Sequence, residues 1–385
     1  MTPSAGEKMS APAGEMTIGF CAPDEIARVM AFLHDHWSAT HILANDRALM
    51  DWQHGNARDA RYDILLAREA DGAIAAMLGV IDTRRYGDAP DDASLWLTTW
   101  MVRPGLKAGG LGLRLVKHLQ RTVPHALIGT VGNNAATEPL YRALGFATGT
   151  LDRYGIVNPA RAEPLVEGAA HYRPPAHDSG ATVRILTDAW LDTPEAARLF
   201  ACPRVPVRSA AYIRTRYLAH PVYRYALLGI EAGGGIAALA VARICEAKDA
   251  TALRIVDVIG PDAALAPMGD ALARHIAVQG HAFADLYIAG APDTALAASA
   301  WAPVPQDGPL RLPNHFEPFT PGNVTLRYAA KTRSPAPLRL VKADCDQDRP
   351  NIALPATSAQ PAAHPDPASA TTGGCRALTE KAIGQ

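Results

Sequence analysis

The chain has almost no net charge. Its 385 residues carry 37 lysines and arginines against 38 aspartates and glutamates, which leaves a formal net charge of −1. Proteins that bind nucleic acid or an anionic membrane by charge concentrate an excess of basic residues on the binding surface. The composition therefore gives no reason to expect either partner.

Long apolar runs are also lacking. The longest candidate, residues 225–244, is interrupted by Glu231, by the glycines at 233–235 and by Arg243, so it is too polar to cross a bilayer. The first 16 residues have no apolar core of the kind that a secretory signal needs. We expect a soluble, cytoplasmic protein without a membrane partner.

Cysteine is scarce and scattered. The five cysteines are odd in number and show no paired short spacing: Cys21, Cys202, Cys245, Cys345 and Cys375. This pattern indicates neither a disulfide framework nor a zinc site, and we expect no metal.

Apolar material is plentiful, since 48% of the residues are hydrophobic, and the length suits two domains. Segments rich in proline, alanine and glycine bury too little apolar surface to offset the entropy of ordering. They divide the chain into a leader (1–15), a first unit (16–157), a linker (158–180), a second unit (181–335) and a C-terminal appendage with a disordered tail (336–385).

Apolar periodicity predicts the same α/β order twice. In the first unit we expect helices at 24–36 and 46–53, a hairpin at 62–82, a strand at 94–102, a helix at 112–122, a strand at 126–131, a helix at 135–144 and a last strand. In the second we expect helices at 194–200 and 210–218, a hairpin at 225–244, a strand at 253–260, a helix at 268–279, a strand at 284–290 and a helix at Ala295. The two units therefore read as tandem copies.

A glycine-rich turn follows the strand at 94–102. Pro104 ends the strand, and Lys107-Ala-Gly-Gly-Leu-Gly112 opens the next helix. Glycines let backbone N–H groups approach a ligand, and a helix N-terminus favours negative charge, so the turn predicts a pyrophosphate cradle. A P-loop is excluded because no Gly-Lys-Ser/Thr follows, and a Rossmann fingerprint would lie on the first strand of the fold.

The segment resembles motif A of the GNAT acetyltransferases, V-x-P-x-x-[QR]-x-x-G-x-[GA], with Lys107 at the Gln/Arg position. Downstream, residues 134–146 resemble motif B, N-x-x-A-x-x-L-Y-x-x-x-G-F, with Thr137 in place of the small residue. The resemblance implies two GNAT-like α/β (α+β) units, each a mixed, mostly antiparallel twisted sheet flanked by helices. It implies acetyl-CoA as co-substrate, with contacts from Met101, Val102, Lys107, Ala108, Gly109, Gly110, Leu111, Gly112, Asn134 and Tyr141.

The reaction of this family is direct attack of an amine on the thioester. By resemblance, a backbone N–H near residues 100–102 polarises the thioester oxygen, Tyr141 protonates the leaving thiolate, and Asn134 holds the pantetheine or the helix start. Tyr141 beside a Gly-Phe pair is also a good packing residue. A base must accept the proton of the ammonium, but residues 96–100, where many members carry a carboxylate, have none.

Histidine and tryptophan gather between the first two helices. This stretch contains His34, His36, Trp37 and His41, and Trp52 follows in the next helix. One interpretation is a substrate pocket with His36 or His41 as base, because the pKa of histidine is near neutral, and with Trp37 or Trp52 as a wall. The other is a polar helix end with core tryptophans.

The second unit lacks the motif chemistry. Its counterpart of motif A has no Gly-x-Gly and carries Pro267 and two aspartates, so we expect it to have lost the cofactor. Its arginines at 204–216 could bind an anion or form a solvated helix face, and we favour the latter. The acidic segment 344–351 lacks the glycine and glutamate of a calcium loop, so we expect a solvated or domain-docking strand.

These features predict an acetyl-CoA-dependent N-acyltransferase that acts on a small amine. An amino sugar, including a nucleotide-linked one, is the first hypothesis, because the Trp-x3-His-Ile-Leu pattern and segment 346–351 resemble proteins of bacterial surface-carbohydrate synthesis. The alternative is a non-catalytic acyl-CoA-binding regulatory or interaction module. The sequence does not indicate the oligomeric state.

Overall fold

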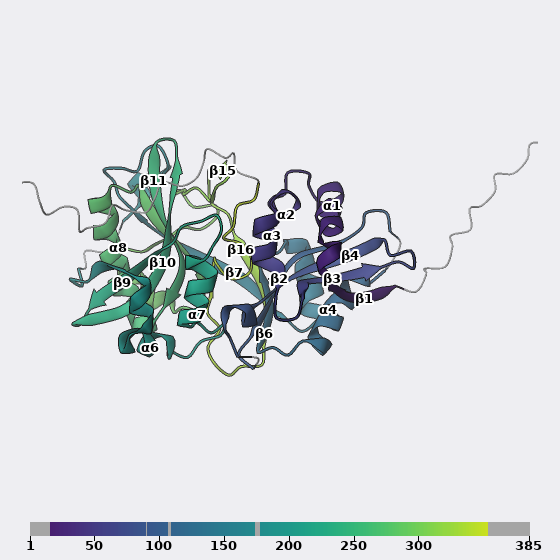
Figure 1. Ribbon diagram of the computed structural model, residues 1–385. Coiled ribbons are helices and arrows are strands. Elements are labelled where there is room, and N and C mark those ends of the chain that lie inside the picture. The colour runs from purple at the N-terminus through teal and green to yellow at the C-terminus, as the bar shows by residue number, and fades with distance from the viewer. Residues whose placement is uncertain (1–15, 90, 107–108, 174–177, 353–385) are drawn as a thin grey trace, which may run out of the picture.

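The computed structural model describes residues 16–89, 91–106, 109–173 and 178–352. The predicted leader, the tail from residue 353 onward, and Lys107 and Ala108 lie outside these ranges. Figure 1 shows two lobes, one formed by the first half of the chain and one by the second.

The first half has the predicted order of elements, with three additions that were not predicted: a strand before the first helix, a one-turn helix before the helix at 46–53 and a two-residue strand after it. It contains β1 (Thr17–Cys21), α1 (Ile26–His36), α2 (Ile42–Asn45), α3 (Arg47–His54), β2 (Gly55–Asn56), β3 (Arg61–Arg68), β4 (Ile74–Asp82), β5 (Ser94–Val102), α4 (Leu111–Thr122), β6 (Leu127–Val131), α5 (Glu138–Ala143) and β7 (Ala147–Val157). The predicted helix at 46–53 begins where expected, because the Asp46 carboxylate accepts the Leu49 N–H at 2.9 Å as an N-cap.

Helices cover both faces of the first sheet. The apolar side chains of α1, α2 and α3 pack on one face, against Ile64, Leu66 and Met77. Those of α4 and α5 pack on the other, where Leu115 and Val116 meet Leu65 and Leu78. Alternate residues of one strand thus enter two different cores, which explains why β3 and β4 are apolar almost throughout.

The second half repeats this order of elements. It contains β8 (Thr182–Leu186), α6 (Pro194–Phe200), α7 (Ala210–Ile213) continued by a π-helical turn (Arg214–Leu218), β9 (Ala226–Ala232), β10 (Gly235–Ala247), β11 (Ala250–Ile259), α8 (Leu265–Gln279), β12 (Phe283–Ala289) and α9 (Asp293–Ala297). The helix at 194–200 has the predicted bounds, and α8 begins three residues before the predicted helix. The repeated order supports the proposed duplication.

The two halves share one continuous sheet, with the strand order β1-β3-β4-β5-β6-β16-β7-β12-β11-β10-β9-β8. Strand β16 (Leu326–Thr332) comes from the end of the second half, yet it lies between β6 and β7 (Figure 1). Strand β7 pairs with β16 through residues 147–151 and with β12 through residues 152–157. The mixed, mostly antiparallel architecture is as predicted. The division into units at residue 158 stays a prediction, since the sheet continues across it.

The acidic segment after β17 (Leu340–Val341) is buried rather than solvated. Arg208 Nη2 donates to the Asp344 carboxylate at 2.7 Å, and Arg243 Nε donates to Asp348 at 3.0 Å. Both aspartates are fully buried, as are these two arginines. The segment therefore docks into the second half, and in the described ranges no group of His, Cys, Asp and Glu side chains is arranged to hold a metal ion.

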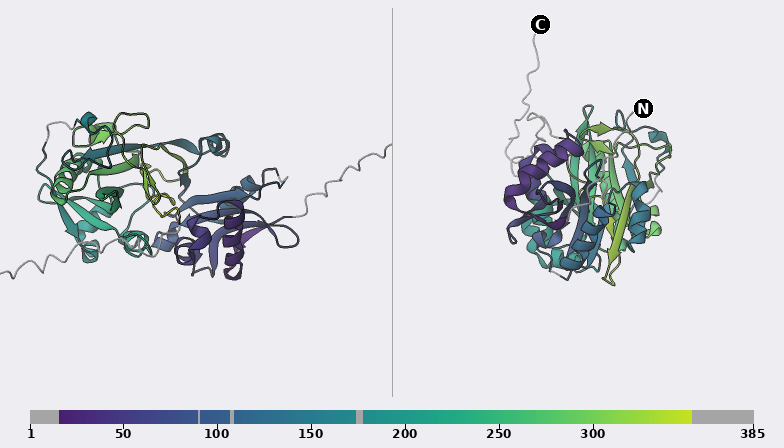
Figure 2. Two further views of the ribbon diagram at one scale, coloured as in Figure 1. Left: turned by 90° about the horizontal axis from the view of Figure 1, so that it is seen from above. Right: turned by 90° about the vertical axis from the view of Figure 1, so that its right-hand side faces the viewer.

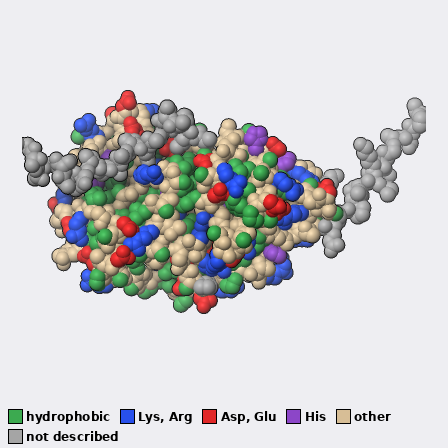
Figure 3. All heavy atoms as spheres, viewed as in Figure 1, with side chains coloured by type: hydrophobic (Ala, Val, Ile, Leu, Met, Phe, Trp, Pro, Cys, Tyr) green, Lys and Arg blue, Asp and Glu red, His purple; other side chains and the backbone are tan. Residues whose placement is uncertain are grey.

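Acidic and basic side chains are interspersed on the face of the molecule seen in Figure 3. Within the residues that the structure describes, no helix is both long and apolar enough to cross a membrane. The views in Figure 2 show the two lobes joined along the continuous sheet, with the helices on its outer faces.

Candidate functional site

Strands β5 and β6 form a V in the first half. They pair in parallel over three residue pairs, which join 94–96 to 127–129. Beyond Trp96, no described strand pairs with β5 on the β6 side. The register between β4 and β5 shifts between Leu78 and Val80, which places a β-bulge near Thr98. A bulge re-aims the backbone locally, and on the β6 side residues 97–102 have no described strand partner.

Helix α4 begins beside the open end of this V. Gly110 is its N-cap, with φ 74°, a left-handed conformation that favours glycine. At Gly112, an added Cβ would lie 2.7 Å from the indole nitrogen of Trp100, so a side chain there would displace the ring. An added Cβ at Gly109 would meet nothing within 4 Å. Leu111 is buried under the first turn. The exposed glycines thus present backbone N–H groups at a helix N-terminus.

Tyr141 lies in the core next to the V. Its ring packs edge-on against Trp100 and Phe146, at centroid distances of 5.8 and 5.4 Å. Burial raises the pKa of Tyr141. The hydroxyl therefore keeps its proton at neutral pH, as a general acid must, and Tyr141 fills the packing role as well.

Asn134 lies where β6 leads into α5. Its side-chain oxygen accepts the Ala136 N–H at 3.0 Å and caps the short 3-10 turn before the helix. The resemblance implied two roles for Asn134. This hydrogen bond confirms the role at the helix start, and a contact with pantetheine stays a prediction. Met101 is buried against the helices α1–α3, whereas Val102 is half-buried at the α4 side.

A thiol from the far end of the chain lies at the apex of the V. Cys345 Sγ donates to the Leu97 carbonyl at 3.3 Å and lies 4.0 Å from the Thr130 hydroxyl on β6, so it bridges the strands just beyond their last pair. Cys345 has φ 62°, a conformation rare for residues other than glycine. Burial raises its pKa well above the usual value, so the group is a neutral thiol. The sequence offered no signal for this placement beyond the acidic residues around it.

His41 contacts the same C-terminal segment. Its Nδ1 faces the Leu43 N–H at 3.3 Å, and its Nε2 lies 3.3 Å from Arg349 Nη2. Burial and the charge of Arg349 lower the pKa of His41 to about 4. The near-neutral pKa expected from the sequence is therefore wrong for His41, because burial and the charge of Arg349 disfavour a second proton on the ring.

The other members of the cluster face solvent. Trp37 is 52% exposed, and His36 is exposed with its ring edge-on against Phe32. The interpretation of Trp37 as a core residue is wrong, since the helix ends at this point and the chain turns outward. A role of His36 or Trp37 in substrate binding stays a prediction.

His54 is a candidate that the sequence reasoning missed. It ends α3 and is fully buried, with Nδ1 donating to the Val80 carbonyl at 2.9 Å. A Cβ added to Gly79 would lie 2.3 Å from Thr98 Oγ1 and 3.2 Å from the His54 ring, so His54 lies beside the bulge of β5. Burial lowers its pKa to about 4. The signal was its position two residues after Trp52, which the sequence suggested as a pocket wall.

Trp52 lies where the two halves meet. Its ring is half-buried, and its centroid lies 4.3 Å from that of His220 in the second half. The prediction of a pocket wall at Trp52 therefore places any such pocket against both halves of the chain.

The corresponding V of the second half is filled. Strands β11 and β12 also pair in parallel over three residue pairs, 253–255 with 284–286. Beyond these pairs, β17 joins β12, and the Ala343 N–H donates to the Val256 carbonyl at 3.2 Å. The helix start is equally changed, because η7 (Asp262–Ala264) follows Pro261 and places a carboxylate where α4 has glycines. Both features support the predicted loss of cofactor binding in this half.

Comparisons with known proteins identify the fold. A GCN5-related N-acetyltransferase from Anabaena variabilis aligns with a TM-score of 0.50 and 10% identity over 83% of this chain and 73% of its own. A putative acetyltransferase from Pyrococcus horikoshii aligns at a TM-score of 0.45 and 11% identity over 90% and 96% of the two chains, and one from Kribbella flavida at 0.45 and 12% over 83% and 71%. No protein-family model and no curated protein sequence matches. The chain has the GCN5-related N-acetyltransferase fold, and the Anabaena alignment includes both halves.

Proposed function

We propose that the chain is an acetyl-CoA-dependent N-acyltransferase, with its active site in the first half and a small amine as acceptor. The observation that carries this proposal is the V between β5 and β6, with exposed glycines at the start of α4 and the Tyr141 ring beside it. The pantetheine arm would lie along β5, with the pyrophosphate at the N-terminus of α4.

The reaction would be direct transfer. The amine nitrogen attacks the thioester carbonyl, the carbon–sulfur bond breaks, and the thiolate of CoA takes the Tyr141 proton. A backbone N–H of residues 98–102 would stabilise the oxyanion, since a bulge interrupts the pairing of β5 near Thr98 and β6 does not pair with β5 beyond Trp96. Because burial raises the pKa of the Tyr141 hydroxyl, the group still carries its proton when the thiolate forms and can donate it.

His41 is the stronger of the two predicted bases. It is half-buried and contacts the segment that crosses the V, whereas His36 is exposed. With a pKa of about 4, His41 is unprotonated at neutral pH and accepts a proton only as the attacking ammonium becomes acidic. His54 and the Asp346 carboxylate, which forms an ion pair with Arg349 at 3.2 Å, are the other bases near the bulge.

The test is release of free thiol from acetyl-CoA with a panel of small amines that includes amino sugars. Turnover that depends on both the amine and Tyr141 would support the proposal. One observation favours the alternative of a non-catalytic acyl-CoA-binding module: β5 carries no carboxylate at the bulge. Stoichiometric binding of acetyl-CoA without turnover of any amine would select that alternative.

A further inference from the structure

Two guanidinium groups flank Trp52 at the junction of the halves. Arg85, from the short helix after β4, donates to the backbone carbonyls of Trp52 and Gln53. Arg216, from the π-helical turn of the second half, lies with its guanidinium carbon 5.3 Å from the Trp52 ring centre. Arg216 is 3% exposed, so the prediction of a solvated face is wrong at this position. Both cations therefore lie against one half-buried tryptophan.

These cations have no carboxylate partner in the described part of the chain. Arg216 Nη2 donates to the Ala343 carbonyl at 3.2 Å, and its Nη1 is buried without a partner. The nearby Asp348 carboxylate is already used, since Arg243 Nε and the Tyr225 hydroxyl donate to its two oxygens. Buried charge without a counterion is costly, so the junction favours an anion.

The other unpartnered polar atoms here are also donors. His220 Nδ1 accepts the N–H groups of Val222 and Tyr223 at 3.1 and 3.0 Å, which places the ring proton on Nε2. This Nε2 and the indole nitrogen of Trp52 are buried without an acceptor among the described residues. Because the rings of Trp52 and His220 are in contact and Arg216 lies over Trp52, three unused donors belong to one cluster.

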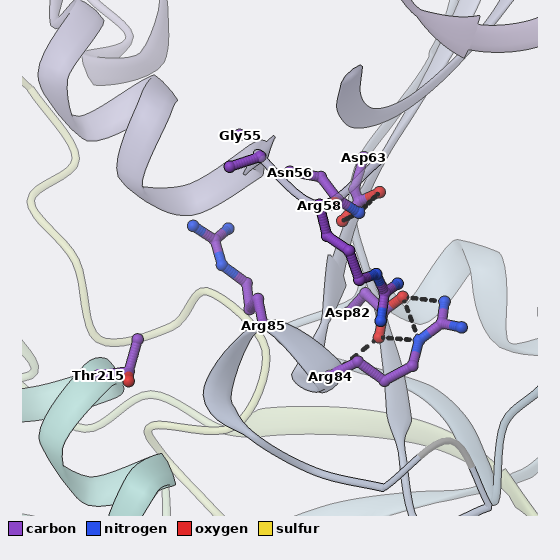
Figure 4. Close-up of a pocket in the computed structure, with 9 residues that line it drawn as sticks. Gly55, Asn56, Arg58, Asp63, Asp82, Arg84, Arg85 and Thr215 are labelled. Carbon is purple, nitrogen blue, oxygen red and sulfur yellow. Dashed lines mark hydrogen bonds and ion pairs between the residues drawn. The ribbon is translucent and has the colours of Figure 1, made fainter. Parts of the chain in front are cut away.

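A cavity is lined by residues that are close in sequence to this cluster, although Trp52, Arg216 and His220 do not themselves line it. It has a volume of about 340 Å³ and is lined by both halves, with Gly55 and Arg85 on one side and Thr215 on the other. Figure 4 shows the Arg85 side chain pointing toward the end of α3 and away from the ion pair of Arg84 with Asp82. Thr215 precedes Arg216, and Gly55 lies three residues after Trp52, so the cavity and the donors share the same backbone.

We propose that Trp52, Arg216 and His220 bind the anionic group, a carboxylate or a phosphate, of the acceptor amine. This inference rests on the proposed function, and it makes the second half a specificity element for the first. Trp52 is two residues from His54, which lies beside the bulge of β5. An acceptor anchored at Trp52 would thus extend its amine toward the thioester, and a neutral amine would lack the anchor.

The test compares acceptors that differ by one anionic group: glucosamine with glucosamine 6-phosphate, ethanolamine with phosphoethanolamine, and glycinamide with glycine. We expect kcat/KM to favour an anionic member. Hydrogen bonds to charged groups contribute enough that Arg216→Gln should reduce this preference by about 10- to 100-fold, through KM. The matched control is Arg214→Gln, because Arg214 lies two residues away and pairs with Asp188 and Asp192 at the surface. His220→Gln gives the same readout if Arg216→Gln does not fold.

A preference for neutral amines, or an anionic preference that survives in both variants, would overturn the inference. If the wild type turns over no amine, the proposed function fails, and calorimetry with glucosamine 6-phosphate then tests the site by itself. Binding by the wild type and the Arg214 variant that is lost in Arg216→Gln supports the anion site. Absence of binding to the wild type rejects it.

Discussion

Each half has the same order of elements and its own pair of parallel strands. The halves differ in what lies beyond that pair. In the first half, β5 and β6 separate after Trp96, and the bridge at the apex is one cysteine side chain. In the second, β17 continues the sheet into the equivalent space. The fold supplies the V, and whether it can hold a thioester depends on the segment that the chain places there.

The C-terminal segment produces this difference. Residues 340–343 pair with strands of the second V, and the chain then contacts the first half, where Cys345 lies at the V and the Ile42 N–H donates to the Asn351 carbonyl at 3.0 Å. Buried ion pairs of Asp344 and Asp348 hold the segment in the second half. The C-terminal segment thus fills the V of the second half and lies beside the candidate site of the first half.

The largest expected effect concerns cofactor binding. Gly112→Leu should lower the affinity for acetyl-CoA by at least about 100-fold, because the side chain would collide with Trp100 and occupy the start of α4. Calorimetry should find one site per chain in the wild type. Gly109→Ala is the control, since its added methyl group meets nothing within 4 Å. Two equal sites per chain would abolish the distinction between the halves.

Next in size is the effect on chemistry. Tyr141→Phe should reduce kcat by about 100-fold, since loss of a general acid typically costs that much, while the affinity for acetyl-CoA stays nearly constant. The aromatic contacts with Trp100 and Phe146 are retained in this variant, so folding should be preserved. Turnover equal to that of the wild type would assign Tyr141 to packing alone.

A smaller effect is expected at the base. His41→Ala should lower kcat/KM by about tenfold, less than for a base of matched pKa, because a group with a pKa of about 4 is a weak base at neutral pH. The rate profile should show no histidine transition near pH 6.5. His36→Ala, at the exposed end of α1, should have no effect on it. A transition near pH 6.5 that disappears in His36→Ala would reverse this assignment.

The last effect concerns stability rather than activity. The folded pKa of His54, about 4, lies below the unfolded value of about 6.5, so the unfolded chain binds more protons between these values. Its contribution to the free energy of unfolding is therefore complete above pH 6.5 and is lost as the pH falls toward 4. Denaturant titrations should show His54→Gln to have a flatter dependence in this window. His36→Gln, which alters an exposed ring, should follow the wild type; equal slopes in all three proteins would contradict the prediction.

The sequence predicted those helices and strands that have a strong local pattern. The apolar spacing of α1 and α4 and the glycines before α4 mark boundaries that the structure places within three residues of the predicted ones. The unpredicted strands β1, β8, β16 and β17 are short or weakly apolar. They form because a neighbouring strand offers unpaired N–H and C=O groups, which residues 326–332 do not reveal.

The residues of the candidate site also fall into two groups: those that the sequence revealed and those that it did not. The glycine-rich turn and Tyr141 are recognisable because their chemistry depends on neighbours in sequence. The placement of Cys345 against Leu97 joins residues 248 positions apart, and the approach of His220 to Trp52 joins two halves. Such contacts are decided by how the sheet closes and by which segment packs into which gap.

The sequence by itself determined the repeated α/β order, the glycine-rich helix start and the loss of these glycines in the second half, because each depends on residues a few positions apart. The tertiary structure decided which V is filled, that His41 and His54 titrate near pH 4, and that Arg216 is buried without a carboxylate partner in the described chain. Burial and charge at a site are sums over neighbours from distant segments, so they exist only once the chain has folded.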